Sequence, residues 1–221
     1  MAESLVRSRL HVEGPDDLHS ITHLLIHNGI QYHPKEFDRS PHELPQIIAV
    51  SNITSLLAGM ETTVSTNTNR TVGFLLDADS SLIDRWRAVS QKLRNVEVTD
   101  LPDRPPAEGF IGESSKYKTR VGVWLMPDNR IDGKLEDFLM TLVPEGNPLI
   151  GHAETSTQTA KQLGAKFSGP DQIKARIHAW LAWQAVPGLP YGAAIKAQYF
   201  RHDSPPAVVF VRWFKELYRI A

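Results

Sequence analysis

Acidic residues follow the apolar segments of the chain at points where strands are expected to end. Glu13 comes directly after the first such segment, and Asp77 and Asp79 follow a later one, residues 71–76. In an open parallel sheet the ligand site lies beyond the carboxyl ends of the strands, so these side chains are expected at one edge. Carboxylates gathered there repel one another unless a divalent cation neutralises them, and hard oxygen ligands select Mg²⁺ or Mn²⁺. The spacing therefore indicates a metal-dependent phosphoryl-transfer site.

Helix capping is the alternative explanation for the same acids. Asp16 or Asp17 would cap the first expected helix, and Asp79 would cap the third, because a carboxylate at the start of a helix accepts backbone N–H groups. Further acids follow the next apolar segment, namely Asp128, Glu136 and Asp137. Spacing alone leaves both interpretations open.

Strand-like and helix-like segments alternate around these acids. Alternating or continuous apolar runs predict strands at 9–12, 46–50, 71–76 and 121–126, with a short one near 110–111, and apolar residues at helical spacing predict helices at 16–27, 53–60, 82–93 and 134–142. Strands that are apolar on both faces and alternate with helices are typical of a parallel sheet. The sequence therefore predicts an α/β fold with a mainly parallel sheet flanked by helices.

The character of the chain changes beyond residue 150. Strand signals stop, and helices are predicted at 152–165, 171–185 and 207–218. Residues 1–150 hold 15 Lys and Arg against 21 Asp and Glu, whereas residues 151–221 hold 9 against 4. We therefore expect an α/β core at 1–150 and a basic, helical C-terminal extension at 151–221 that contacts DNA or RNA. The candidate phosphate contacts are Lys174, Arg176 and Lys196. Chance variation between two helical surfaces is the alternative.

Composition narrows the class of protein further. Hydrophobic residues make up 41% and charged residues 22%, as in ordinary globular proteins. No run approaches the roughly 18 apolar residues of a membrane helix, and residues 1–9 lack the apolar core of a signal peptide. A cytoplasmic protein without a membrane partner is expected. The absence of cysteine excludes disulfides, thiolate nucleophiles and iron–sulfur clusters.

Other motifs carry less chemistry. His19, His23 and His27 recur every four residues on one helix face, where two imidazoles could hold zinc. No H-E-x-x-H pattern accompanies them, so a solvated or half-buried face is the favoured explanation. Lys116, Lys118 and Arg120 form a short basic cluster, which either contacts phosphates or lies on a solvated strand edge. Phosphate-cradling, dinucleotide-binding and serine-hydrolase motifs are missing from the sequence.

Two segments taken together resemble the Toprim domain of topoisomerases, bacterial primases and the overcoming-lysogenization-defect nucleases. They are Val-Glu-Gly-Pro-Asp-Asp at 12–17 and the apolar strand that ends in Asp-Ala-Asp at 77–79. The resemblance implies a Rossmann-like Toprim fold over about the first 145 residues. It also implies that Glu13 is the general acid or base and that Asp77 and Asp79 bind Mg²⁺ or Mn²⁺. Asp17 matches the second acid of the nuclease branch. We expect Glu13 and Asp17 to bind the metal ion together with Asp77 and Asp79.

Residues 123–137 look most like stand-alone Toprim-like proteins, and the resemblance makes Glu136 the candidate late acidic ligand. The zinc-binding region of primases, the strand-passage domains of topoisomerases and the fused ATPase of the lysogeny-defect nucleases are missing from this sequence. A Mg²⁺- or Mn²⁺-dependent nuclease acting on DNA or RNA is therefore expected, with a separate partner ATPase or other activating protein as a further expectation. The alternative is a catalytically silent Toprim module that binds nucleic acid or protein.

Overall fold

The computed structural model describes residues 7–221, so residues 1–6, part of the segment examined for a signal peptide, lie outside the described residues. A five-stranded sheet with the order β2-β1-β3-β5-β4 forms its centre. The strands are β1 (Arg9–Val12), β2 (Gln46–Ala49), β3 (Thr71–Asp77), β4 (Phe110–Glu113) and β5 (Arg120–Met126). β1, β2, β3 and β5 are parallel, and β4 pairs with β5 in the antiparallel direction. The predicted α/β class with a mainly parallel sheet flanked by helices is confirmed.

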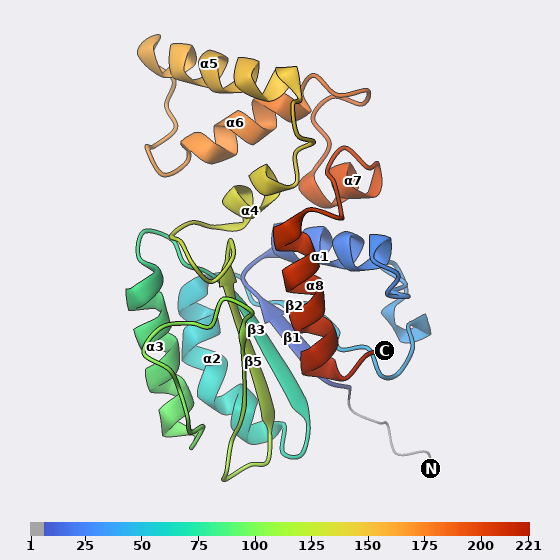
Figure 1. Cartoon of the computed structure of the whole chain (residues 1–221), viewed down its shortest axis with the longest axis vertical. Helices are drawn as coiled ribbons and strands as arrows, with labels where there is room; N and C mark the ends of the chain where they lie inside the picture. Colours follow the sequence, from blue (N-terminus) through green and yellow to red (C-terminus); the bar gives the residue numbers. More distant parts are fainter. Residues whose placement is uncertain (1–6) are drawn as a thin grey trace.

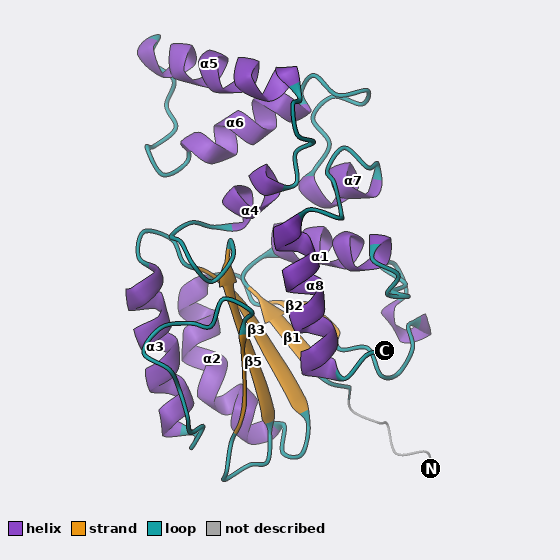
Figure 2. Cartoon of the chain, in the orientation of Figure 1, coloured by secondary structure: helices purple, strands orange, loops and turns teal. Residues whose placement is uncertain are grey.

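Helices cover both faces of this sheet and extend beyond its carboxyl edge (Figures 1 and 2). They are α1 (Pro15–His27), α2 (Ile53–Thr66), α3 (Leu82–Asn95), α4 (Leu135–Thr141), α5 (Pro148–Gln162), α6 (Gln172–Leu181), α7 (Tyr191–Lys196) and α8 (Pro205–Tyr218), with a short 3₁₀ turn at Phe37–Arg39. α2 and α3 lie on one face, and α1 and α8 lie on the other. α4 to α7 lie past the strand ends, where Figure 1 shows them above the sheet.

The central strands are apolar because both of their faces are buried. Along β3, Phe74 and Leu76 point into the core beneath α2 and α3, whereas Leu75 points into the core beneath α1 and α8. Burial of such side chains stabilises the fold by about 1.5–3 kcal/mol each. The alternation therefore fixes the register of β3, and with it the position of Asp77 at the carboxyl edge.

Close packing of α8 on the sheet depends on two glycines in neighbouring strands. A Cβ atom on Gly122 of β5 would lie 2.3 Å from Leu217 Cδ2, and one on Gly73 of β3 would lie 2.4 Å from Tyr218 Oη. The Tyr218 hydroxyl donates to the Arg9 carbonyl at 2.7 Å. The last helix of the chain thus packs directly on the α/β core. The division at residue 150 stays a prediction.

Most predicted elements lie within a few residues of their observed bounds. α2 continues to Thr66, well past the expected end at residue 60. The β-branched residues of its last turns have low helix propensity, but burial of Val64 stabilises the helix there. α5 begins at Pro148, where the Asn147 side chain accepts the Leu149 N–H, so it starts before the expected residue 152. α7 was not expected from the sequence. In residues 7–221, no helix is long and apolar enough to cross a membrane.

Candidate functional site

Glu13 and Asp77 lie together at the carboxyl edge of the sheet. Glu13 directly follows β1, Asp77 ends β3, and the two strands are neighbours. The Glu13 carboxylate accepts the backbone N–H of Asp77, with 2.8 Å between Oε1 and N. Burial raises the pKa of Glu13, and the Asp77 N–H opposes that shift. The two acids therefore lie at one sheet edge, as the sequence predicts, and the contact joins the carboxylate of Glu13 to the backbone of Asp77.

Asp77 is the most perturbed acid of this edge. Its Oδ1 accepts the Leu135 N–H at 3.0 Å, at the start of α4. Burial raises the pKa of the Asp77 carboxyl to about 9, and the charges of the surrounding carboxylates add to that shift. Those carboxylates are Asp17, Glu13, Asp79 and Glu136. The four other predicted acids therefore act on Asp77 across this edge, and the Asp77 carboxyl keeps its proton at neutral pH when no cation is bound.

Asp17 has a capping contact on one oxygen and none on the other. Its Oδ2 accepts the Gly14 N–H at 3.0 Å in the first turn of α1, so the capping interpretation holds for this residue. Its Oδ1 is buried and has no hydrogen-bond partner among the described residues. Burial raises the pKa of Asp17 to about 7, with a smaller contribution from Glu13. A buried, unpartnered carboxylate oxygen is unusual and marks a position suited to a cation.

Asp79 does not cap α3, which corrects that part of the capping interpretation. Ser81 is the N-cap, since its hydroxyl accepts the Asp84 N–H. Asp79 instead pairs with Arg85, with 2.6 Å between Oδ2 and Nη2. Arg85 Nε also donates to the Asp77 carbonyl at 2.8 Å. Arg85 therefore fixes the chain on both sides of the Asp-Ala-Asp segment.

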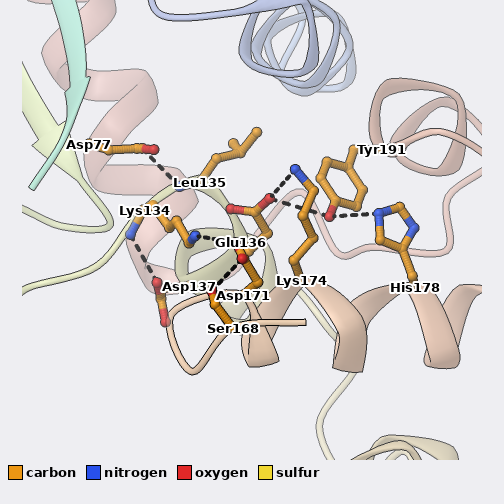
Figure 3. A network of polar contacts seen from close by, with 10 residues as sticks. All are labelled: Asp77, Lys134, Leu135, Glu136, Asp137, Ser168, Asp171, Lys174, His178 and Tyr191. Atoms are coloured by element: carbon orange, nitrogen blue, oxygen red, sulfur yellow. Dashed lines mark hydrogen bonds and ion pairs between the residues drawn. The ribbon is translucent and has the colours of Figure 1, made fainter. Parts of the chain in front are cut away.

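Glu136 connects the acid cluster to the helices beyond the sheet (Figure 3). It is 5% exposed, in the first turn of α4. Its Oε1 lies 3.2 Å from Lys174 Nζ on α6 and accepts the Tyr191 hydroxyl of α7 at 3.4 Å. Tyr191 Oη lies 3.2 Å from His178 Nε2. Burial, and then the Glu136 charge, raises the pKa of Tyr191, so the phenol keeps its proton and donates a hydrogen bond to the carboxylate.

Two of the three basic residues predicted to bind nucleic acid have acidic partners in the protein. Lys174 pairs with Glu136, and Arg176 Nη1 lies 2.7 Å from Glu154 Oε2. Lys196 lies near the α1 histidines, and burial followed by the charge of Lys196 lowers the pKa of His23. The nucleic-acid role of these three residues stays a prediction.

The donor chemistry of the edge fits a hard divalent cation, although the side chains are not yet arranged around one position. Among residues 7–221, no three acidic or histidine side chains are gathered in the geometry of a metal site, and this covers the three α1 histidines as well. Glu13, Asp77 and Asp17 each place one carboxylate oxygen on a backbone N–H. Such anchoring orients the other oxygen of each group, as outer contacts do for metal ligands.

The sequence analysis missed the residues that hold the acids in place. Arg85 could have been suspected, because it lies in the helix that follows the Asp-Ala-Asp segment. Asp132, whose Oδ1 accepts the Leu82 N–H at 2.7 Å at the start of α3, follows the turn after β5. Tyr191 and His178 carry no such signal, because their contact with Glu136 depends on the packing of α6 and α7.

Comparison with known proteins identifies the family of the chain but does not indicate an activity. The model of one family, described as "Protein of unknown function (DUF3226)", matches residues 7–219, nearly the whole chain. Neither the curated proteins nor the solved structures contain a significant match to the chain.

Proposed function

The chain belongs to the DUF3226 family, and we propose that it is a Mg²⁺- or Mn²⁺-dependent nuclease with a Toprim-like active site at the carboxyl edge of its sheet. The observation that carries the proposal is the contact between Glu13 and Asp77, which joins acids from two neighbouring parallel strands. The crowding of carboxyl groups at that edge, where burial and then the neighbouring carboxylates raise the pKa of Asp77 to about 9, supports a cation as the partner that would let Asp77 ionise.

The acids have different roles in the proposed reaction. Glu13, Asp77, Asp79 and Asp17 would hold the cation, and Glu136 would hold it from the α4 side. A divalent cation, when bound, would supply positive charge for the phosphate and lower the pKa of a bound water. Glu13 suits proton transfer, because burial raises the pKa of its carboxyl toward neutrality.

Arg85 would act as a positioning residue for these acids. It binds both the Asp79 carboxylate and the Asp77 carbonyl, so it fixes the separation of the two aspartates. The Arg85 guanidinium is paired with the Asp79 carboxylate, so it differs from an arginine that binds substrate phosphate. A rigid Asp-Ala-Asp segment would keep the ligands in place through the reaction.

Cleavage assays on single acid variants test the proposal. We expect the wild-type protein to cleave fluorescent DNA or RNA in Mn²⁺ and to lose cleavage in excess EDTA. Glu13→Ala and Asp79→Ala should each lower the rate by at least 100-fold. Asp128→Ala is the matched control, because Asp128 lies at the same edge but only accepts the N–H groups of a turn. Cleavage that survives both acid variants, or persists in EDTA, would contradict the proposal.

A catalytically silent binding module is the second candidate. The ion pairs of Asp79 with Arg85 and of Glu136 with Lys174 favour it, because protein cations already neutralise part of the acidic charge. A silent module would bind nucleic acid or protein with the same affinity in EDTA and in Mn²⁺, and acid variants would not change that affinity.

A partner ATPase or other activating protein stays a prediction, as does the cytoplasmic location. An activator would explain wild-type protein that binds nucleic acid and Mn²⁺ but does not cleave alone. Addition of cell extract from the source organism to purified wild type and Glu13→Ala would reveal such a factor, because only the wild type would gain activity.

A further inference from the structure

A groove beside α3 carries three arginines that the proposed acid site does not use. It lies between α3 and the loop that leads toward β4, has a volume of about 380 Å³, and is lined by Arg87, Arg94 and Arg104. Asp103 is the acidic residue of the lining. The groove is therefore strongly basic, although the acidic residues of the whole chain slightly outnumber its lysines and arginines.

These arginines form few and weak ion pairs with acidic residues of the described part of the protein. Arg87 Nη1 lies 3.0 Å from Asp84 Oδ1, but the two side chains are 73% and 71% exposed. Such exposed pairs contribute little and exchange readily for another anion. Within residues 7–221, no ion pair is found for Arg94 or Arg104. Lys174 and Arg176 differ, because each has an acidic partner inside the protein.

The groove also contains a buried donor that lacks a protein partner. Ser90 lines it and is 2% exposed, and its hydroxyl makes no hydrogen bond among the described residues. Buried hydroxyl groups in proteins normally have a partner. A hydroxyl donor among guanidinium groups is the combination that phosphate oxygens accept from.

We propose that this groove binds the phosphodiester backbone of a nucleic acid strand through Arg87, Arg94, Arg104 and Ser90. Arg87 and Arg94 are seven residues apart on α3, about 10.5 Å along the helix axis. Measured along the axis of a duplex, that distance corresponds to about three nucleotides of one strand at roughly 3.4 Å each. The inference rests on the proposed function. The groove and the acid site share helix α3, because Arg85 of this helix pairs with Asp79.

The groove recognises backbone rather than bases. Trp86, its aromatic residue, is 1% exposed, and its indole N–H donates to the Pro102 carbonyl at 2.8 Å. Its ring is therefore not available for base stacking, which is the usual means of holding unpaired bases. Contacts to phosphate alone position a strand and do not specify its sequence. Affinity should therefore depend strongly on salt and weakly on sequence.

Fluorescence anisotropy with labelled 20-nucleotide DNA and RNA, in EDTA to prevent cleavage, tests the groove. The variant is Arg94→Ala with Arg104→Ala, since both side chains are exposed. We expect its affinity to fall at least tenfold and the slope of log K against log salt to fall by about 2. Lys35→Ala with Arg39→Ala removes the same charge from exposed positions outside the groove and outside residues 151–221, and should change affinity less than threefold.

Two results would overturn the proposal that this groove binds nucleic acid. One is equal affinity of the groove variant and the control, and the other is wild-type protein that binds none of these oligonucleotides. Hydrolysis of bis(p-nitrophenyl) phosphate in Mn²⁺ reports on the acid site separately, because this small diester does not need the groove. Retained hydrolysis with unchanged oligonucleotide affinity in the groove variant would reject the groove and keep the proposed function. Loss of hydrolysis in Glu13→Ala with normal binding would support both.

Discussion

Asp77→Asn should stabilise the metal-free protein at neutral and alkaline pH. The substitution keeps an oxygen that accepts the Leu135 N–H and removes the charge that faces Glu13. In the folded protein burial, and then the neighbouring carboxylates, raise the pKa of Asp77 from 3.8 to about 9. An acid whose pKa is raised on folding costs no stability below its unfolded pKa. The cost grows as pH rises from about 4 toward 9.

The size of the effect follows from the pKa shift. One pKa unit corresponds to about 1.36 kcal/mol, so a lone carboxyl with this shift would lose roughly 4 kcal/mol of stability between pH 5 and pH 8. Asp17, with a pKa raised to about 7 chiefly by burial, belongs to the same cluster and shares the titration. We therefore expect Asp77→Asn to increase the free energy of unfolding at pH 8 by about 1–3 kcal/mol, and to change it little at pH 4.

Urea unfolding in EDTA at pH 4, 5, 6.5 and 8, followed by far-ultraviolet circular dichroism, measures this difference. Asp128→Asn serves as the control, because it removes a carboxylate from the same sheet edge and keeps an oxygen for the N–H groups of Arg130 and Ile131. The reasoning is refuted if Asp77→Asn loses 1 kcal/mol or more at pH 8, on the order of a lost cap, or if the wild-type stability stays flat between pH 5 and pH 8.

Three further predictions concern metal binding and packing. Saturating Mn²⁺ should raise the wild-type Tm and leave that of Asp77→Asn unchanged, as differential scanning fluorimetry would show. Gly122→Ala should cost about 1–3 kcal/mol in urea unfolding, because its Cβ would lie 2.3 Å from Leu217, whereas Gly59→Ala, in an open part of α2, should stabilise by about 0.5–1 kcal/mol. Equal effects would refute the packing argument. Tyr191→Phe should cost about 1 kcal/mol, because buried Glu136 loses a donor; a neutral result would remove the phenol from the network.

The meeting of Glu13 and Asp77 was predictable because it follows from local pattern and one general rule. Apolar runs locate the strands, and the carboxyl ends of parallel strands share an edge. The rule places both ends at one edge, whereas the direct contact between them also depends on β1 and β3 being neighbours, which the sequence did not predict. Asp79 was placed at the same edge by its position two residues after Asp77.

The partners of the acids could not be predicted, because they depend on contacts between distant segments. Glu136 and Lys174 belong to α4 and α6, and sequence periodicity does not specify how two helices pack. The charge excess beyond residue 150 indicated a surface for polyanions, but part of that charge is paired with Glu136 and Glu154. Net charge counts residues and does not show which of them face solvent.

The most direct test of the account is a crystal of the protein grown or soaked in Mn²⁺, with anomalous scattering used to locate the ion. The account predicts a Mn²⁺ peak at the carboxyl edge of the sheet, within about 2.6 Å of an Asp77 oxygen and of an oxygen from Glu13 or Asp79. The same peak should be missing from crystals of Asp77→Asn. A well-ordered wild-type crystal in saturating Mn²⁺ with no peak at this edge, or with Mn²⁺ only at other acids, would contradict it.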